Sequence, residues 1–86
     1  MAKYKITIKK SAVKELEDIP KKDLRRIVKR IQSLTQNPRP QGCQKLSGQS
    51  RFRIRRGDYR IVYSIEDKGF IVDIVKIGHR REIYRS

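Results

Sequence analysis

The sequence predicts an α+β fold in which a helical hairpin covers one face of a small, mostly antiparallel sheet. Three observations predict it: an alternating segment near the N-terminus, a helical stretch after it, and a C-terminal half of alternating segments joined by short turns. Such grouping of helices and strands is typical of the α+β class. With 86 residues the chain has room for one core. We therefore expect residues 1–86 to form a single domain with one N-terminal strand, two helices and a three-stranded antiparallel meander.

The N-terminal strand is predicted over residues 3–9. Polar side chains alternate there with Tyr and Ile, and a period of two marks a half-buried strand. Ser11 stands where a helix N-cap is expected, because its hydroxyl can accept a hydrogen bond from a free backbone N–H. The apolar face of this first helix is formed by Ala12, Val13 and Leu16. The helix is expected to end before Pro20.

A second, amphipathic helix is predicted to begin at Pro20, which suits the first helical position. Between Leu24 and Leu34, apolar residues recur at steps of three and four and form one stripe. The opposite face carries Lys21, Lys22, Arg25, Arg26, Lys29 and Arg30. That face is either a solvated helix surface or a phosphate-binding one. The helix is expected to stop near Asn37, since two prolines follow, and residues 39–50 are predicted to be a loop.

Gly57-Asp58 predicts the turn of a hairpin between two alternating segments. If these two residues form the turn, Arg55 lies opposite Arg60, and opposed residues share a face of the sheet. The helix-covered face then holds Phe52, Ile54, Ile61 and Tyr63. The other face holds Arg53, Arg55 and Arg60. A slip of one residue would mix Arg with Ile on both faces, so the apolar pattern supports this register.

The last predicted strand covers residues 70–77, which are apolar on both faces at all but two positions, as expected of a central strand. Lys68-Gly69 supplies the turn before it, and Gly78 is expected to end it. This register places Asp73 opposite Ser64, from where its carboxylate could neutralise the facing arginines. Two interpretations of the arginines remain open: an ion-paired sheet surface, or an anion site with guanidinium groups preset for phosphate.

The chain is strongly basic, with 23 Lys and Arg against 9 Asp and Glu and a formal net charge of +14. We expect nucleic acid, an acidic protein, or both in turn as partners, rather than a membrane surface; a merely basic domain without such a partner is the remaining possibility. Cys43 is the one cysteine, so no intramolecular disulfide is possible. No apolar run reaches the ~20 residues of a membrane helix, and no signal peptide is recognisable. We expect a cytoplasmic protein with no metal and no cofactor.

The C-terminal tail, residues 79–86, mixes basic and aromatic side chains. Tyr84 could stack on a base while neighbouring arginines hold phosphates, or it could cover a sheet edge. His79 is the one side chain with an ordinary pKa near neutrality. Its charged form is disfavoured beside Arg80 and Arg81, which would keep it available as a base. A purely structural histidine is the alternative.

Three sequence motifs, in this order, resemble the RelE/ParE superfamily of toxins from type II toxin–antitoxin systems. They are Lys45-Leu46-Ser47-Gly48, the segment from Arg53 to Tyr63, and the segment from Ile77 to Tyr84. The resemblance covers nearly the whole chain, and the ending Gly-His-Arg-Arg-Glu-Ile-Tyr is similar to RelE rather than to ParE. It implies a RelE-like fold and a metal-independent endoribonuclease, an mRNA interferase acting on message in the ribosomal A site. It also implies an acidic, RelB-like antitoxin as cognate partner.

The resemblance also implies roles for individual residues. The catalytic set would be Arg53, Arg55, Arg60, His79, Arg80 and Tyr84, and further RNA contacts would come from Lys45, Arg51, Arg56, Arg81 and Arg85. Arg60 would clamp the phosphate in the transition state, Arg80 would steady the leaving oxygen, and Tyr84 would orient the base. Some relatives have a lysine where Arg55 stands and can use it as a general base. A guanidinium with a pKa above about 12 is a poor base, so either Arg55 acts electrostatically or His79 takes the proton.

Two other functions share the fold or the charge. A ParE-like inhibitor would bind DNA gyrase without needing the arginine and tyrosine set, and a binding module would hold RNA without cutting it. The acidic antitoxin is expected to lay an amphipathic helix across the helix surface or an exposed sheet edge and to contact the arginine face.

Overall fold

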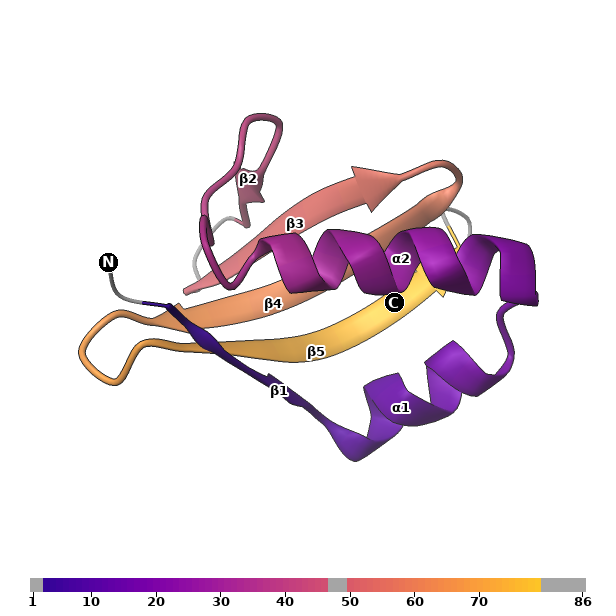
Figure 1. The fold of residues 1–86 in the computed structure, drawn as a ribbon, viewed down its shortest axis with the longest axis horizontal. Coiled ribbons are helices and arrows are strands. Elements are labelled where there is room, and N and C mark those ends of the chain that lie inside the picture. The colour runs from indigo at the N-terminus through magenta and orange to yellow at the C-terminus, as the bar shows by residue number, and fades with distance from the viewer. Residues whose placement is uncertain (1–2, 47–49, 80–86) are drawn as a thin grey trace.

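The computed structural model describes residues 3–46 and 50–79 as two helices packed on one face of a five-stranded sheet (Figure 1). The elements in chain order are β1 (Lys5–Ile8), α1 (Lys10–Glu17), α2 (Lys21–Ser33), β2 (Gln44–Lys45), β3 (Arg51–Arg56), β4 (Tyr59–Glu66) and β5 (Ile71–His79). The strand order in the sheet is β1-β5-β4-β3-β2. The predicted α+β class and the order of strand, helical hairpin and meander are confirmed.

The sheet is mixed, because β1 runs parallel to β5 while the remaining neighbours are antiparallel. The prediction of a loop over residues 39–50 is wrong at β2, whose two residues pair with Phe52 and Arg53. This pairing gives β3 a partner on its outer edge over two residues. The rest of that edge lies beside α2.

The helix starts differ from the predicted ones by two residues in α1 and by one residue in α2. The N-cap of α1 is Lys9, whose N–H donates to Ile74 O at 3.0 Å as the last bond of the β1–β5 ladder. Its carbonyl then accepts from Val13 N at 3.0 Å and begins the helix, so Ser11 lies in the first turn and the prediction of a Ser11 cap is wrong. Pro20 is the N-cap of α2 rather than its first helical residue.

The β3–β4 hairpin has the predicted register. Arg55 pairs with Arg60 and Ile54 with Ile61 around a turn in which Gly57 has a positive φ of 60°. This backbone conformation is strained for most residues but open to glycine, which explains the glycine at this turn. The helix-side set and the arginine set predicted from this register therefore lie on opposite faces of the sheet.

Strand β5 departs from simple alternation at a β-bulge. Val62 pairs with Lys76 but Tyr63 pairs with Ile74, so one extra residue of β5 lies between them. The bulge lets Ile74 and Ile77, three positions apart, both point into the core, which is why this strand reads as apolar on both faces. Asp73 lies opposite Ser64 as predicted. The prediction that Gly78 ends the strand is wrong, because the start of β4 continues the ladder through Gly78 to His79.

The core lies between the helices and the sheet. Its buried members are Ala12, Ile19, Ile27, Ile31, Leu34, Ile54, Ile61, Tyr63, Val72, Ile74 and Ile77. In the described part of the chain, no helix has the length and apolar character needed to span a bilayer.

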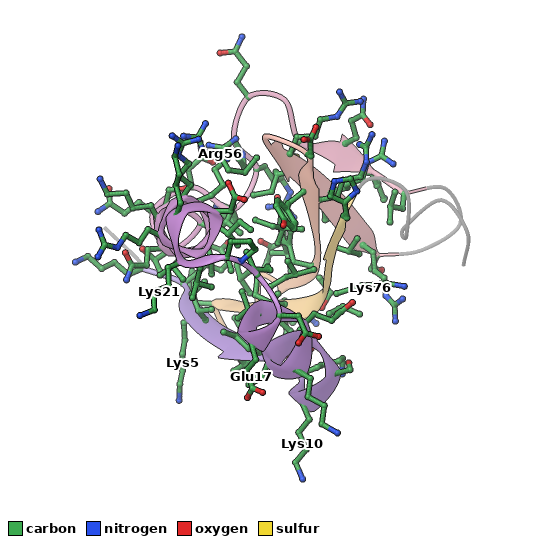
Figure 2. All side chains as sticks on the ribbon, turned by 90° about the vertical axis from the view of Figure 1, so that its right-hand side faces the viewer. Lys5, Lys10, Glu17, Lys21, Arg56 and Lys76 are labelled. Atoms are coloured by element: carbon green, nitrogen blue, oxygen red, sulfur yellow. The ribbon has the colours of Figure 1, made fainter. Side chains whose placement is uncertain are left out.

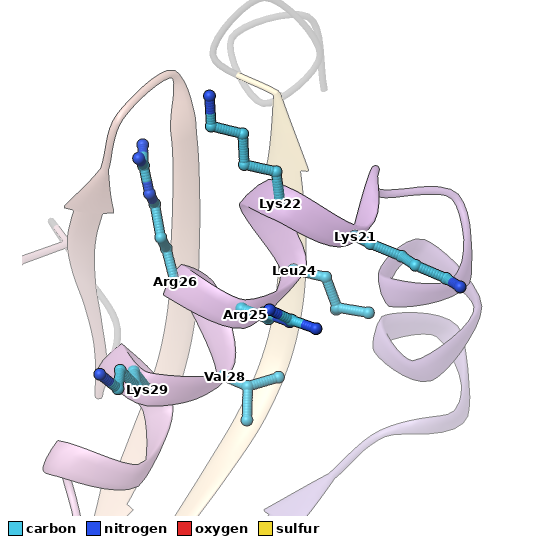
Figure 3. A pocket seen from close by; sticks show the side chains of 7 residues that line it. All are labelled: Lys21, Lys22, Leu24, Arg25, Arg26, Val28 and Lys29. Atoms are coloured by element: carbon cyan, nitrogen blue, oxygen red, sulfur yellow. The ribbon is translucent and has the colours of Figure 1, made fainter.

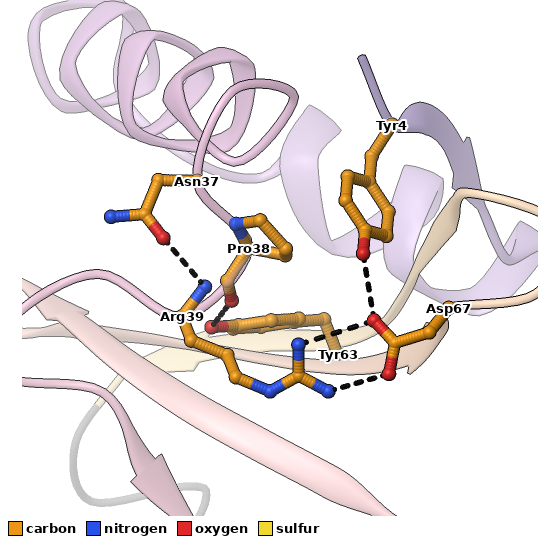
Figure 4. Close-up of polar contacts among 6 residues, drawn as sticks. All are labelled: Tyr4, Asn37, Pro38, Arg39, Tyr63 and Asp67. Carbon is orange, nitrogen blue, oxygen red and sulfur yellow. Dashed lines mark hydrogen bonds and ion pairs between the residues drawn. The ribbon is translucent and has the colours of Figure 1, made fainter. Parts of the chain in front are cut away.

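The loop after α2 is tied to the sheet by polar contacts (Figure 4). The buried hydroxyl of Tyr63 donates to the carbonyl of Pro38 at 2.7 Å, and burial raises the pKa of this tyrosine. The guanidinium of Arg39 donates from both terminal nitrogens to Asp67, at 3.2 and 2.8 Å, and Tyr4 donates to the same carboxylate at 2.7 Å. These contacts set the path of the chain into β2, and β2 in turn contributes a residue to the candidate site.

Candidate functional site

The arginines of the hairpin converge on the sheet face that the helices leave uncovered. Because opposed residues share a face, Arg55 and Arg60 lie side by side there, and Arg53 lies opposite Val62. Among the described residues, Arg60 is the one buried charged side chain, with an exposed fraction of 1%. Charged side chains are rarely buried to this extent, which marks Arg60 as a candidate functional residue.

Arg53 and Arg55 line one cavity of about 300 Å³ together with Arg30 of α2. The remaining lining residues are Gly42, Gln44 and Ile54. Gln44 of β2 accepts a hydrogen bond from Nη2 of Arg53 and so orients that guanidinium. Sequence reasoning missed Gln44, because it lay in a predicted loop with no periodicity, and it left open whether the α2 cations bind phosphate.

Asp73 does not neutralise the arginines, although its register is as predicted. Its carboxylate accepts a hydrogen bond from Thr7 Oγ1 at 2.8 Å and lies 3.4 Å from Lys9 Nζ. Both partners come from the β1 side of the sheet, on the other side of β5 from β4. Within the described residues, neither Arg53 nor Arg55 forms a salt bridge, which favours the anion site over an ion-paired surface.

His79 lies on the helix-covered face, away from the arginines. It pairs with Tyr59 in the ladder, and the two rings meet edge to face with centroids 5.6 Å apart. Its surroundings come from the C-terminal end of α1 and the two residues after it: Glu15, Asp18 and Ile19 line the same hollow of about 300 Å³. The structure therefore separates His79 from the hairpin arginines, with which the sequence had grouped it.

The other predicted RNA contacts are spread along the strands. Arg51 is exposed opposite Ser64 on the arginine face, Lys45 is exposed in β2 opposite Phe52, and Arg56 is exposed next to the turn. The predicted residues Arg80, Arg81, Tyr84 and Arg85 lie outside the described residues.

The described groups of this site are suited to holding negative charge. Guanidinium groups stay protonated at neutral pH and present donors that match phosphate oxygens. They are poor general bases, so they contribute electrostatic stabilisation rather than proton abstraction. Over residues 3–46 and 50–79, no group of three or more His, Cys, Asp or Glu side chains is placed to hold a metal ion.

Comparisons with known proteins agree on one family. Residues 6–84 match the protein family described as the ParE toxin of the type II toxin–antitoxin system parDE. The RelE1 protein of Methanocaldococcus jannaschii is 30% identical over 88 residues, which cover 98% of each chain.

Solved structures of RelE toxins share the fold. The toxin of the RelBE2 toxin–antitoxin complex from Mycobacterium tuberculosis has a TM-score of 0.83 and 28% identity, over 93% of this chain and 94% of that chain. The RelE–RelB complex from Pyrococcus horikoshii has a TM-score of 0.82 and 33% identity, over 91% and 96%. The chain thus belongs to the RelE/ParE family of toxins from type II toxin–antitoxin systems, and its fold is the RelE one.

Proposed function

We propose that the protein is a RelE-type endoribonuclease that cuts messenger RNA on the ribosome and so inhibits translation in the cytoplasm. The observation that supports this most directly is the cluster of Arg53, Arg55 and Arg60 on one sheet face, two of which line a single cavity. Such a cluster suits a bent phosphodiester. An inhibitor that acts by binding a protein has no need of it.

In the proposed reaction, the ribose 2′-oxygen forms a bond to the adjacent phosphorus while the bond to the 5′-oxygen breaks. The 2′-hydroxyl loses its proton and the 5′-oxygen gains one, which leaves a 2′,3′-cyclic phosphate and a 5′-hydroxyl. The phosphorane between these states carries two negative charges. Electrostatic stabilisation of this charge by cations already in place is usually the largest contribution to the rate enhancement.

We assign Arg60 to the phosphorane, with Arg53 and Arg55 holding the phosphate beside it. Arg60 enters from β4 and is buried, so its position is well defined. Arg53 is oriented by Gln44. By family resemblance, Arg80 would steady the leaving oxygen and Tyr84 would orient the neighbouring base. His79 has no part in proton transfer in this scheme, because it lies on the other face of the sheet.

Primer extension on message from cells that express the chain tests the proposal. Wild type is expected to give discrete cuts on translated message with cyclic-phosphate ends. Arg53→Ala and the double variant Arg60→Ala/Arg80→Ala are expected to give none, whereas Arg25→Ala, an exposed arginine on α2, is expected to cut normally. Because Arg60 is buried, circular dichroism on each variant must show a folded protein. Comparable single-turnover cleavage by wild type and folded Arg60→Ala would show that the assignment is wrong.

We also propose that an acidic, RelB-like antitoxin neutralises the protein, since relatives of the same fold were solved as RelB–RelE complexes. The surface of α2 has a binding site suited to it: Leu24 and the exposed Val28 lie in a hollow of about 830 Å³ (Figure 3). Its rim is cationic, formed by Lys21, Lys22, Arg25, Arg26 and Lys29. An amphipathic helix with apolar and acidic faces matches both features. Val28→Asp is expected to weaken this complex at all salt concentrations, and a complex indifferent to both salt and Val28 would contradict the assignment.

A second candidate is inhibition of DNA gyrase, because the matching family is described as the ParE toxin of parDE. The two functions leave different products in the cell. Cut message with intact DNA supports the endonuclease; intact message with DNA breaks and an SOS response supports the gyrase inhibitor.

A further inference from the structure

A groove between α2 and β3 gathers cations from both elements, and we call it the α2–β3 groove. Its volume is about 670 Å³. It is lined by Arg26, Lys29, Arg30, Ser33, Arg55 and Arg56. Figure 2, which views α2 end on, shows Arg56 beside this helix. Five cationic side chains and one hydroxyl thus face one hollow, and no carboxylate or apolar side chain is among them.

The groove exists because β2 covers little of the outer edge of β3. The two strands pair only at Arg53 and Phe52, so the part of β3 that leads to the turn faces α2. On α2, Arg26 and Arg30 are four residues apart and therefore lie on the same side of the helix. Like charges at this spacing repel and destabilise the helix slightly.

No ion pair among residues 3–46 and 50–79 relieves this repulsion. Within the described residues, the salt bridges are Lys9 with Asp73 and Arg39 with Asp67, and neither involves a residue of the groove. An anion in the groove would relieve several like-charge contacts at once, which is the condition for a strong, salt-dependent site.

The chemistry of the lining favours a phosphate backbone over an acidic protein helix. Arginine side chains match phosphate oxygens with paired donors. An amphipathic helix needs an apolar surface to pack on. The hollow at Leu24 and Val28 has such a surface, and this groove lacks one. The groove also adjoins the candidate catalytic site, because Arg30 and Arg55 line both it and the cavity that holds Arg53. A strand that passes through the site would therefore run along the groove.

We propose that the α2–β3 groove binds the backbone of the RNA next to the cleaved segment, through phosphate contacts from Arg26, Lys29 and Arg30. The proposal rests on the proposed function for its choice of RNA as the polyanion. It adds that α2, and not only the sheet, positions the RNA. Contacts of this kind are independent of base sequence.

The test is the salt dependence of binding to a short single-stranded 2′-O-methyl RNA, which lacks the attacking hydroxyl and cannot be cut. Each phosphate contact to a single strand contributes about 0.7 to the slope of log affinity against log salt. The full-length variant Arg26→Ala/Lys29→Ala/Arg30→Ala is therefore expected to lower that slope by about 2, so that its affinity falls about a hundredfold further behind wild type for each tenfold decrease in salt.

The matched control is Lys21→Ala/Lys22→Ala/Arg25→Ala, which removes three charges from the same helix but no residue of the groove. It is expected to leave the slope close to that of wild type. A charge-preserving variant, Arg26→Lys/Arg30→Lys, should also keep the slope, which separates lost charge from lost folding.

Equal slopes for the groove variant and its matched control would overturn the proposal. So would a folded groove variant that binds RNA normally but no longer binds poly-glutamate, since that would assign the groove to an acidic protein segment. If the wild type cuts no message in cells yet shows the groove-dependent slope, the endonuclease function fails while the groove remains an RNA site.

Discussion

Arg55 lies directly opposite Arg60 across the β3–β4 ladder, with Arg60 buried and Arg55 exposed. Like charges at opposed positions destabilise a sheet by a few tenths of a kcal/mol to about 1 kcal/mol. Arg55 is also the residue of this pair that lines both the cavity and the α2–β3 groove. A cation at position 55 therefore costs stability, whereas the proposed function requires it.

We predict that Arg55→Gln stabilises the fold by about 0.5 kcal/mol, because it removes the like-charge contact with Arg60. The same change is expected to weaken RNA binding. Urea unfolding gives the first quantity and RNA titration the second. Arg51→Gln, at an exposed position opposite Ser64, is the control and should leave stability unchanged. An Arg55→Gln variant that is less stable than wild type would show that the two guanidinium groups do not repel each other.

The hydrogen bond from Arg53 to Gln44 predicts that β2 tunes the site. Gln44→Ala leaves Arg53 charged but without its orienting partner, and we expect single-turnover cleavage to fall several-fold with little change in stability. Gln44→Glu places a carboxylate beside Arg53 and is expected to reduce cleavage further, because it neutralises a cation that we propose holds the phosphate. If Gln44→Glu cleaved as fast as wild type, Arg53 would have no electrostatic role in the reaction.

A His79 variant tests the hypothesis, drawn from the sequence, that this histidine is the general base. Because it lies on the helix-covered face beside Tyr59, His79→Gln is expected to keep cleavage within about threefold of wild type and to leave the pH–rate profile unchanged. Loss of a true general base costs about 10²–10⁴-fold. A loss of that size, with the acid limb of the profile gone, would return His79 to the catalytic set.

The contacts around Asp67 predict a pH dependence of stability. The hydrogen bonds from Arg39, and then that from Tyr4, lower the pKa of Asp67 below its ordinary value of 3.8 in the folded protein. A carboxylate whose pKa is depressed on folding adds stability above its unfolded pKa, and that stability is lost as the pH falls through the folded pKa. We therefore expect the free energy of unfolding to drop below about pH 4 in wild type, and to drop less in Asp67→Asn.

Urea unfolding at a series of acid pH values measures this difference. Glu17→Gln, which removes an exposed carboxylate without a salt bridge in the described structure, is the control and should follow the wild-type curve. Parallel curves for wild type and Asp67→Asn would mean that the Arg39 contact contributes no net stability in solution.

Much of the local structure could be predicted from the sequence. The hairpin register followed from alternation around Gly57-Asp58, since a one-residue slip would have moved every apolar side chain to the wrong face. The helical stripe from Leu24 to Leu34 followed in the same way from its period. The shared face of Arg53, Arg55 and Arg60 is a direct consequence of that register, which the structure confirms.

Other features depended on contacts between distant segments. The parallel pairing of β1 with β5, the bulge in β5 and the placement of His79 beside α1 all arise where the chain meets parts of itself far away in sequence. The α2–β3 groove is of the same kind, because neither the helix nor the strand predicts which cations of the other it will face.

The amino-acid sequence by itself determined on which side of its helix or strand each residue lies, and therefore which arginines share a face. Its motifs also indicated the RelE/ParE family. Only the tertiary structure decided which helix lies beside which strand edge, and therefore that the cations of α2 adjoin Arg55 and Arg56 while His79 is turned away. The physical reason is that periodicity and turn chemistry act over a few neighbouring residues, whereas the neighbours of an element are set by how the whole core packs.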